Sequence, residues 1–429
     1  MPTGVDNEKL SVPGRRTSYF DRCSSLEAGR IDDLVALQRG VIGSRIHLVA
    51  SACYPFDSVL RALAEPSFVL PAEGMPGARY LPGAAVMDLV EDTGEDLTLE
   101  LFGRPTGYRA TLQPHSGTQA NQIVYNAVLH PDDTVLCLRP RDGGHISHTV
   151  VISRRHATIN YGLTTQGLVD YDEMRALAIK HRPRLIIAGG SALPRAIDFR
   201  VCADIAREVG ALLHADLSHT ATFVAAKLHP STFPHCDFVT FNSVKNLRGP
   251  NAGVLIYRSE FEGDVHSSIF PTTQGGANES FMLGQLACLL EWQERDIEAY
   301  AAGIVFSAKT LGREFAKSNI SLVTGGTDSH MLLLDLREFG LSGAEAEHRL
   351  DSLGVLANRN LVPGDPRSPR ETSGLRIGVT NLSILGYESE DLRLLANWIA
   401  QVLTDQAPSR AIVDHLVDKY QRHLVAPMW

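Results

Sequence analysis

The sequence predicts an α/β protein whose mostly parallel sheet is flanked by helices, followed by a smaller α+β domain. Short apolar, β-prone runs alternate with helical patterns between residues 84 and 258, which is typical of βαβ units. Beyond about residue 290 long helical patterns dominate, with two further strand-like runs. The length of 429 residues exceeds one typical core, so two domains are expected.

The individual elements follow from periodicity and from turn-forming residues. Residues 1–50 predict an arm and one helix (26–41), and prolines and glycines predict loops over 51–83. Helical spacing appears at 85–102, 119–129 and 199–210, and strand-like runs at 133–138, 184–189, 211–216, 237–243 and 253–258. One long helix (288–318), two strands (330–336 and 374–379) and two helices (343–353 and 387–404) follow. These patterns divide the chain into an arm and helix (1–50), a large domain (51–290) and a C-terminal small domain (291–429).

Composition and charge argue against several classes of function. The net charge of −9, without a basic stripe, argues against a nucleic-acid partner. No apolar run approaches the roughly 20 residues that a membrane helix needs. The first 20 residues lack the apolar segment of a signal peptide, so a cytoplasmic location is expected. Six scattered cysteines without a CxxC pair indicate reduced thiols rather than a zinc site.

Polar residues stand at the carboxyl ends of predicted strands, where parallel sheets bind ligands. Lys245 follows an apolar run and is either a surface lysine or a nucleophilic, Schiff-base-forming amine. Asp216 ends another strand, where it either caps the next helix or holds a protonated ring nitrogen. Together with His214 and His219 it could also ligate a metal.

Three further segments carry unusual polarity. Ser116, Gly117 and Thr118 precede a helix and form either an ordinary N-cap or a phosphate site. Two glycines before His145 allow a ligand to approach, so this imidazole either stacks on a ring or belongs to the core. Arg376 interrupts an apolar strand and needs a partner, which is either an internal acid or a substrate carboxylate.

Taken together, these residues supply what pyridoxal 5′-phosphate (PLP) chemistry requires. A lysine forms the Schiff base, an aspartate keeps the pyridine nitrogen protonated, and a helix N-terminus binds the phosphate. A histidine stacks on the ring, and an arginine binds the carboxylate of an amino acid. Their order along the chain is that of the aspartate-aminotransferase-like fold, PLP fold type I. Residues 51–290 are therefore the expected PLP-binding domain.

Over about residues 45–405 the chain resembles the serine hydroxymethyltransferase family. Several long segments match in order: LVAS (48–51), AEGMPGARY (72–80), LQPHSGTQAN (112–121), LHPDDTVL (129–136), GGHISH (143–148), AGGSA (188–192), ADLSHTATFVAAKLHPSTFPHCD (215–237), KNLRGPNAGVLI (245–256), FPTTQGG (270–276), VTGGTDSHMLLLDL (323–336), ANRNLVPGDPRSP (357–369) and TSGLRIGV (372–379). Chance does not explain so many ordered segments.

The resemblance implies a role for each matching residue. Lys245, Asp216, His145 and Glu73 would be catalytic, with Glu73 as the acid–base group. The PLP-binding set would be Ser116, Gly117, Thr118, His145, Ser191, Asp216, His219, Asn242 and Lys245, joined by Gly275 and Gly276 from a neighbouring subunit. Ser191 and His219 would lie near the phenolic oxygen of PLP. Ser51 and Arg376 would bind the substrate carboxylate, and no metal is assigned. Because the family's active site spans a dimer interface, a homodimer is implied.

Apart from Asn242, which replaces a threonine, the departures from the family pattern fall outside the PLP-holding residues. Val244 replaces the histidine before the lysine, and Pro71 and Leu81 replace two tyrosines that assist catalysis and folate use. Further changes are Ala52-Cys53 for a glutamate-asparagine pair, Asn251 for an arginine, Leu361 for a polar residue, and Pro140, Arg141 and Asp142 before GGH. The resemblance with these losses implies PLP-dependent chemistry on a small-molecule amino-acid substrate without tetrahydrofolate.

Known relatives of that kind suggest specific reactions. Loss of bulk at positions 71 and 81 favours a β-substituted L-amino acid, such as a cysteine S-conjugate in antibiotic biosynthesis. The lincosamide-pathway enzymes process such conjugates by β-elimination or by decarboxylating deamination. A threonine transaldolase and a genuine serine hydroxymethyltransferase remain as alternatives. A metal-dependent lyase and a non-catalytic PLP-fold protein are alternatives of other classes.

Overall fold

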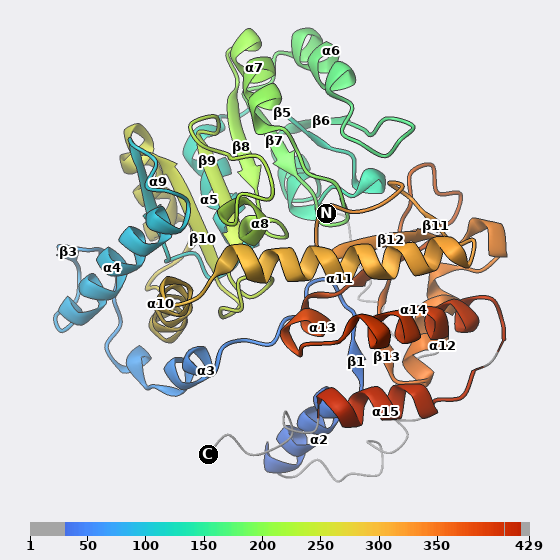
Figure 1. Cartoon of the computed structure of the whole chain (residues 1–429). Coiled ribbons are helices and arrows are strands. Elements are labelled where there is room, and N and C mark those ends of the chain that lie inside the picture. The colour runs from blue at the N-terminus through green and yellow to red at the C-terminus, as the bar shows by residue number, and fades with distance from the viewer. Residues whose placement is uncertain (1–30, 407, 422–429) are drawn as a thin grey trace, which may run out of the picture.

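The computed structural model describes residues 31–406 and 408–421 (Figure 1). The expected arm over residues 1–30 lies outside these described residues, as does the start of the helix predicted over 26–41. Helix α2 (Ile31–Gly43) forms the remainder of that helix. Strand β1 (Ile46–His47) follows and pairs in parallel with β13 (Val355–Leu356), which joins the start of the described chain to its C-terminal part.

A seven-stranded sheet, in the order β4-β10-β9-β8-β7-β5-β6, occupies the upper half of the molecule in Figure 1. Its strands are β4 (Tyr108–Thr111), β5 (Thr134–Leu138), β6 (Ala157–Tyr161), β7 (Leu185–Gly189), β8 (Leu212–Asp216), β9 (Phe238–Asn242) and β10 (Gly253–Arg258). Strands β6, β5, β7, β8 and β9 run parallel, and β10 is antiparallel to both β9 and β4. The predicted α/β class with a mostly parallel sheet is therefore confirmed.

Helices cover both faces of this sheet, because successive side chains along each strand point to opposite faces. On one face, Leu136, Ile186 and Leu213 pack with residues of α6 (Tyr171–His181) and α7 (Phe199–Val209). On the other face, Val135 and Ile187 pack with residues of α5 (Gly117–Val128) and α9 (Glu262–Ser267). Short helix α8 (Ala221–Ala225) follows β8.

Two helices that precede the large sheet in the chain pack against a later helix. Helix α3 (Asp57–Ala64) and helix α4 (Ala85–Leu101) both contact α10 (Glu279–Gln293). Between α3 and α4 a short hairpin, β2 (Gly74–Met75) with β3 (Ala78–Arg79), follows Glu73. Within the described residues, no helix is both long and apolar enough to cross a membrane.

A four-stranded antiparallel sheet, in the order β11-β12-β15-β14, forms the second core. Its strands are β11 (Ser321–Leu322), β12 (Met331–Asp335), β15 (Gly374–Gly378) and β14 (Asn358–Asn360). The helices of this part are α11 (Ile297–Lys317), α12 (Gly343–Ser352), α13 (Thr380–Ile384), α14 (Ser389–Leu403) and α15 (Ala411–Tyr420). Figure 1 shows α11 running across the middle of the molecule, with the large sheet above it and α13, α14 and α15 below it.

Several elements differ from the sequence-based prediction. The loops expected over 51–83 include helix α3 and the β2–β3 hairpin. Helices α6, α8, α9, α13 and α15 and the short strands β1, β11, β13 and β14 were not expected either. The long helix expected over 288–318 is two helices, α10 and α11, because the side chain of Asp296 accepts a hydrogen bond from Ala299 N and caps a new helix. Strands β4 and β6 were not predicted. They are the two edge strands of the large sheet, and β6 has only one buried residue, so it lacks a continuous apolar run.

Candidate active site

The candidate residues lie where the carboxyl ends of adjacent parallel strands meet. Asp216 is the last residue of β8, and the neighbouring strand β9 ends shortly before Lys245. His145 follows β5, and Ser191 follows β7. Arg376 comes from β15 of the smaller sheet and reaches Ser191, since one of its Nη1 protons is donated to the carbonyl oxygen of Ser191. The fold therefore brings the two sheets together at these side chains.

Lys245 is a partly buried amine without a partner. Among the described residues it makes no hydrogen bond or ion pair. Burial lowers its pKa to about 8, an effect that the charge of Asp216 opposes and the charge of Arg376 reinforces. A surface lysine retains an ordinary pKa, so the environment of Lys245 favours the nucleophile interpretation.

Asp216 is a buried carboxylate with three hydrogen-bond donors. Its Oδ2 accepts from Asn121 Nδ2 at 2.8 Å and from His148 Nε2 at 2.9 Å, and its Oδ1 accepts from Ser218 N at 2.9 Å. Burial alone would raise the pKa of Asp216. The hydrogen bond and charge of His148, with the Ser218 N–H and His145, instead hold this pKa well below its ordinary value. The carboxylate is thus ionised and firmly oriented.

His145 is held as a neutral imidazole beside Asp216. Its Nδ1 accepts a hydrogen bond from Ser147 N at 3.2 Å and lies 2.6 Å from Ser147 Oγ. Burial lowers the pKa of His145 to about 4, although Asp216 opposes this shift. A neutral, fixed ring is suited to stacking on an aromatic ligand.

The proposed metal set of His214, Asp216 and His219 does not form a cluster within the described residues. His214 Nε2 lies 2.7 Å from Thr240 Oγ1, and His219 faces His330 instead. The ligand atoms of His145, His148 and Asp216 do lie within 4.8 Å of one another. That closeness arises from the hydrogen bond between His148 and Asp216.

The N-terminus of α5 combines a capped turn with a close approach of backbone. The Ser116 hydroxyl accepts a hydrogen bond from Gln119 N at 3.1 Å, so the ordinary N-cap interpretation holds for this side chain. The N–H groups of Gly117 and Thr118 belong to the first helical turn, which has no intrahelical acceptors. A Cβ at Gly117 would lie 3.3 Å from both Ser218 Oγ and Asn242 Cβ, so a side chain there would crowd the start of this helix.

Asn242 fixes the backbone that leads to Lys245. Its Oδ1 accepts from Val244 N at 2.9 Å, and its Nδ2 donates to Asn251 Oδ1 at 2.9 Å. These two bonds hold the turn after β9. Asn242 thus acts on the position of Lys245 in addition to lining the end of α5.

The loop with Gly275 and Gly276 lies against residues of the same chain. Gly276 O lies 3.3 Å from His115 Nε2, and Gln274 Oε1 accepts from Gln119 Nε2 at 2.7 Å. A Cβ at Gly276 would lie 3.6 Å from Glu73 Cγ, so Glu73 is next to this loop. Whether these residues serve the site of their own chain or of a neighbouring subunit stays a prediction. Ser51 is exposed, and the preceding residue, Ala50, contacts His330 through its carbonyl oxygen.

Several polar residues of the site were not predicted. Asn121 and His148 both bind Asp216, and Asn246 and His330 form a buried network beside His219. The only sequence signal for His148 was its place in the GGHISH segment, three residues after His145. Asn246 and His330 likewise stand in segments that resemble the family, KNLRGPNAGVLI (245–256) and VTGGTDSHMLLLDL (323–336), but their partners lie far away in the sequence.

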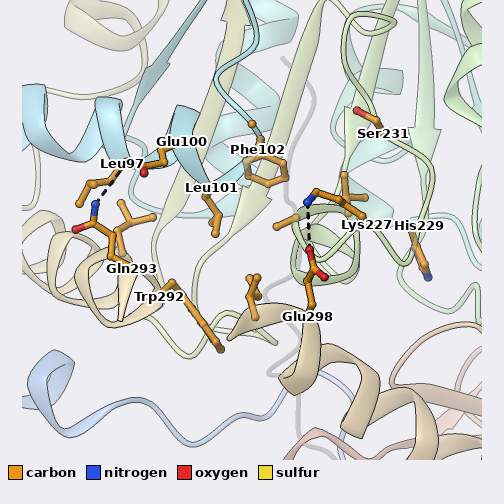
Figure 2. Close-up of a pocket in the computed structure, with 15 residues that line it drawn as sticks. Leu97, Glu100, Leu101, Phe102, Lys227, His229, Ser231, Trp292, Gln293 and Glu298 are labelled. Atoms are coloured by element: carbon orange, nitrogen blue, oxygen red, sulfur yellow. Dashed lines mark hydrogen bonds and ion pairs between the residues drawn. The ribbon is translucent and has the colours of Figure 1, made fainter. Parts of the chain in front are cut away.

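A separate pocket of about 710 Å³ lies between the ends of α4 and α10 and the start of α11 (Figure 2). Its lining includes Phe102, Trp292 and an ion pair between Lys227 and Glu298 at 3.1 Å. None of the predicted site residues lines it. The chemistry-bearing residues therefore gather elsewhere.

The arrangement fits PLP. The unpartnered amine of Lys245 matches the aldehyde of this cofactor, and the ionised Asp216 matches its pyridine nitrogen. The neutral His145 matches the ring, and the helix N-terminus at Gly117 matches the phosphate. The family model described as serine hydroxymethyltransferase matches residues 30–399.

Proposed function

The chain belongs to the serine hydroxymethyltransferase family of PLP-dependent enzymes, and from that premise we propose that it acts on a β-substituted L-amino acid without tetrahydrofolate. We further propose a cysteine S-conjugate of antibiotic biosynthesis as the substrate, cleaved by β-elimination or by decarboxylating deamination.

The observation that carries an amino-acid substrate is the state of Arg376. Its Nε donates to Asn358 Oδ1 at 3.2 Å and its Nη1 to Ser191 O, but no carboxylate of the described residues pairs with it. Burial lowers the pKa of Arg376 to about 10, because a charged guanidinium without an acidic partner is unfavourable where it is desolvated. A carboxylate ligand that accepts two hydrogen bonds would offset this unfavourable free energy.

Each of the other site residues has a proposed role toward the cofactor or the substrate. When bound, PLP supplies a protonated pyridine ring that accepts the electron pair of a broken Cα bond. Asp216 would hold a proton on the pyridine nitrogen, and His145 would pack against the ring. The Lys245 amine, with its pKa near 8, would hold the cofactor and would serve as a proton donor and acceptor at the substrate. Glu73, in the loop before β2, is the second acid–base candidate.

Loss of folate use rests on three departures from the family. Val244, Pro71 and Leu81 stand where the family has a histidine and two tyrosines. Pro71 and Leu81 are exposed and flank Glu73, so neither offers a polar group to a folate. The smaller side chain at each position leaves space for a bulky β-substituent.

We also propose a homodimer, in keeping with the oligomeric habit of the family. Apolar side chains around the Glu73 hairpin each expose more than half of their surface: Phe68, Val69, Leu70, Tyr80, Val86 and Leu89. Such a concentration is typical of a subunit interface. Glu73 and Gly276 lie beside this surface, which supports an active site completed by the partner.

Product analysis by mass spectrometry tests the proposed reaction. The PLP-loaded protein is incubated with an S-alkyl L-cysteine, with L-threonine plus an aldehyde, and with L-serine plus tetrahydrofolate. We expect thiol release or carbon dioxide from the first substrate and no folate-dependent product. Methylene-tetrahydrofolate formed at rates above those with the S-alkyl cysteine would overturn the proposal in favour of a genuine serine hydroxymethyltransferase. A new β-hydroxy amino acid from threonine and aldehyde would indicate a transaldolase.

A further inference from the structure

His330, which precedes β12, is a fully buried histidine whose two ring nitrogens both have partners. Its Nδ1 lies 3.1 Å from Asn246 Nδ2, and its Nε2 lies 3.0 Å from the carbonyl oxygen of Ala50. The same Nε2 lies 3.3 Å from His219 Nδ1, and the two imidazole planes are 10° apart. His330 thus joins the smaller sheet to the turn after β8 and to the segment after Lys245.

The orientation of Asn246 decides where His330 carries its proton. Asn246 Nδ2 also lies 2.8 Å from the carbonyl oxygen of His219, which can only accept, and Asn246 Oδ1 accepts from Thr380 Oγ1 at 2.6 Å. The Asn246 amide is therefore a donor toward His330 Nδ1. Burial lowers the pKa of His330 to about 3, so the ring is neutral and its single proton is on Nε2.

That proton determines the state of His219. His330 Nε2–H donates to Ala50 O and is also directed at His219 Nδ1, so His219 Nδ1 must offer a lone pair, since two N–H groups cannot face each other. Burial, followed by the charges of Lys245 and Arg376, holds the pKa of His219 well below its ordinary value, so His219 is also neutral. Its one proton is consequently on Nε2.

The two nitrogens of an imidazole point in widely different directions, so His219 Nε2 points away from His330. Among the described residues it has no hydrogen-bond partner. Besides His330, the groups whose charges act on His219 are Lys245, Arg376 and Asp216, which belong to the candidate active site. His219 therefore presents a donor toward the site.

We infer that His330 is a positioning residue that fixes His219 in the Nε2–H tautomer, so that His219 donates a hydrogen bond into the active site and does not act there as a base. The catalytic half of this inference rests on the proposed function, because it concerns the role of His219 during PLP chemistry. The tautomer itself is a property of the protein alone.

Nuclear magnetic resonance of ¹⁵N-histidine-labelled full-length protein, with PLP bound and after its removal, reads the tautomer directly. The signals of His219 are identified by their loss in His219→Asn. We expect an unprotonated Nδ1 and a protonated Nε2 in both samples. A protonated Nδ1 in the wild-type protein would overturn the inference without any further variant.

Three variants test the positioning role. His330→Gln places an amide donor near the position of Nε2 and should keep the tautomer of His219. His330→Phe removes the donor and should change the tautomer ratio of His219 by about fivefold, the effect of one neutral hydrogen bond. An unchanged ratio in a folded His330→Phe protein would contradict the role. If that variant does not fold, loss of the tautomer preference in His330→Gln would contradict it instead.

His229 provides a matched control. It is buried, bonds the Asp328 carbonyl oxygen at 2.9 Å, and stacks on Phe223, whose ring also stacks on His330. His229→Phe should leave the signals of His219 unchanged, and an equal change there would show a general effect of the ring stack and overturn the inference. Failure to convert an S-alkyl cysteine would reject the proposed function alone and leave these spectra unaffected.

Discussion

Replacing Arg376 by alanine should weaken amino-acid binding by about two orders of magnitude. Of the five guanidinium N–H groups, two are donated to Asn358 and Ser191, which leaves three for a ligand. Removing one partner of a buried charged pair costs about 3–5 kcal/mol, and each 1.4 kcal/mol is a factor of ten in affinity. Because Arg376 is partly exposed, water screens part of the interaction. We therefore expect the lower end of that range, about 100-fold.

The assay follows the visible spectrum of the PLP-loaded protein during titration with the amino acid. Arg376→Lys keeps the charge but loses the planar fork, so an intermediate affinity is expected. Arg359→Ala is the matched control, because Arg359 lies on the neighbouring strand β14 and is paired with Glu347 at 3.6 Å. If Arg376→Ala folds, retains PLP and binds the amino acid as tightly as Arg359→Ala does, the assigned role of Arg376 is wrong.

Two further predictions concern the cofactor and the subunit interface. The rate at which the PLP-free protein captures PLP should rise as the pH passes through about 8, because the lowered pKa of Lys245 frees its amine there; a midpoint at the ordinary value of 10.5 would refute this. Sedimentation equilibrium should detect a dimer that Leu89→Glu shifts toward monomer, since Leu89 is 67% exposed in the single chain. A wild-type monomer at micromolar concentrations would reject the proposed interface.

The central strands could be predicted from sequence because both of their faces are buried. The runs at 184–189 and 253–258 match β7 (Leu185–Gly189) and β10 (Gly253–Arg258) within one residue. Edge strand β6 gave no such run, because only Tyr161 of its five residues is buried. The break at Asp296 was also missed, since apolar residues continue at helical spacing on both sides of it. Tertiary position decides the first case. The second case has a local cause, the N-cap by Asp296, which the continuing apolar spacing concealed.

The main site residues could be predicted because each stands near a strand end with an uncommon side chain. Their supporting contacts could not. Asn121 and Asp216 are 95 residues apart, and His219 and His330 are 111 apart. Periodicity indicates that such residues are buried but not which polar groups meet. The pairing depends on how the smaller sheet packs against the larger one, and that packing has no local signal in the sequence.

The hydrogen bonds of the histidines in the candidate site bear on the effect of Val244, which stands where the family has a histidine. His145 Nδ1 accepts from Ser147 N, and His219 Nδ1 faces the N–H of His330, so the basic lone pair of each ring is engaged. His148 donates its Nε2–H to Asp216 and is fully buried. The family's further histidine, next to the lysine, is Val244 here. We therefore propose Lys245, whose pKa of about 8 suits proton transfer near neutral pH, and Glu73 as the groups that transfer a proton at a substrate carbon. β-Elimination requires the exchange of one proton at the substrate, and Lys245 is suited to that exchange. The histidine that the resemblance to folate-dependent relatives would place beside Lys245 is absent, because Val244 stands there.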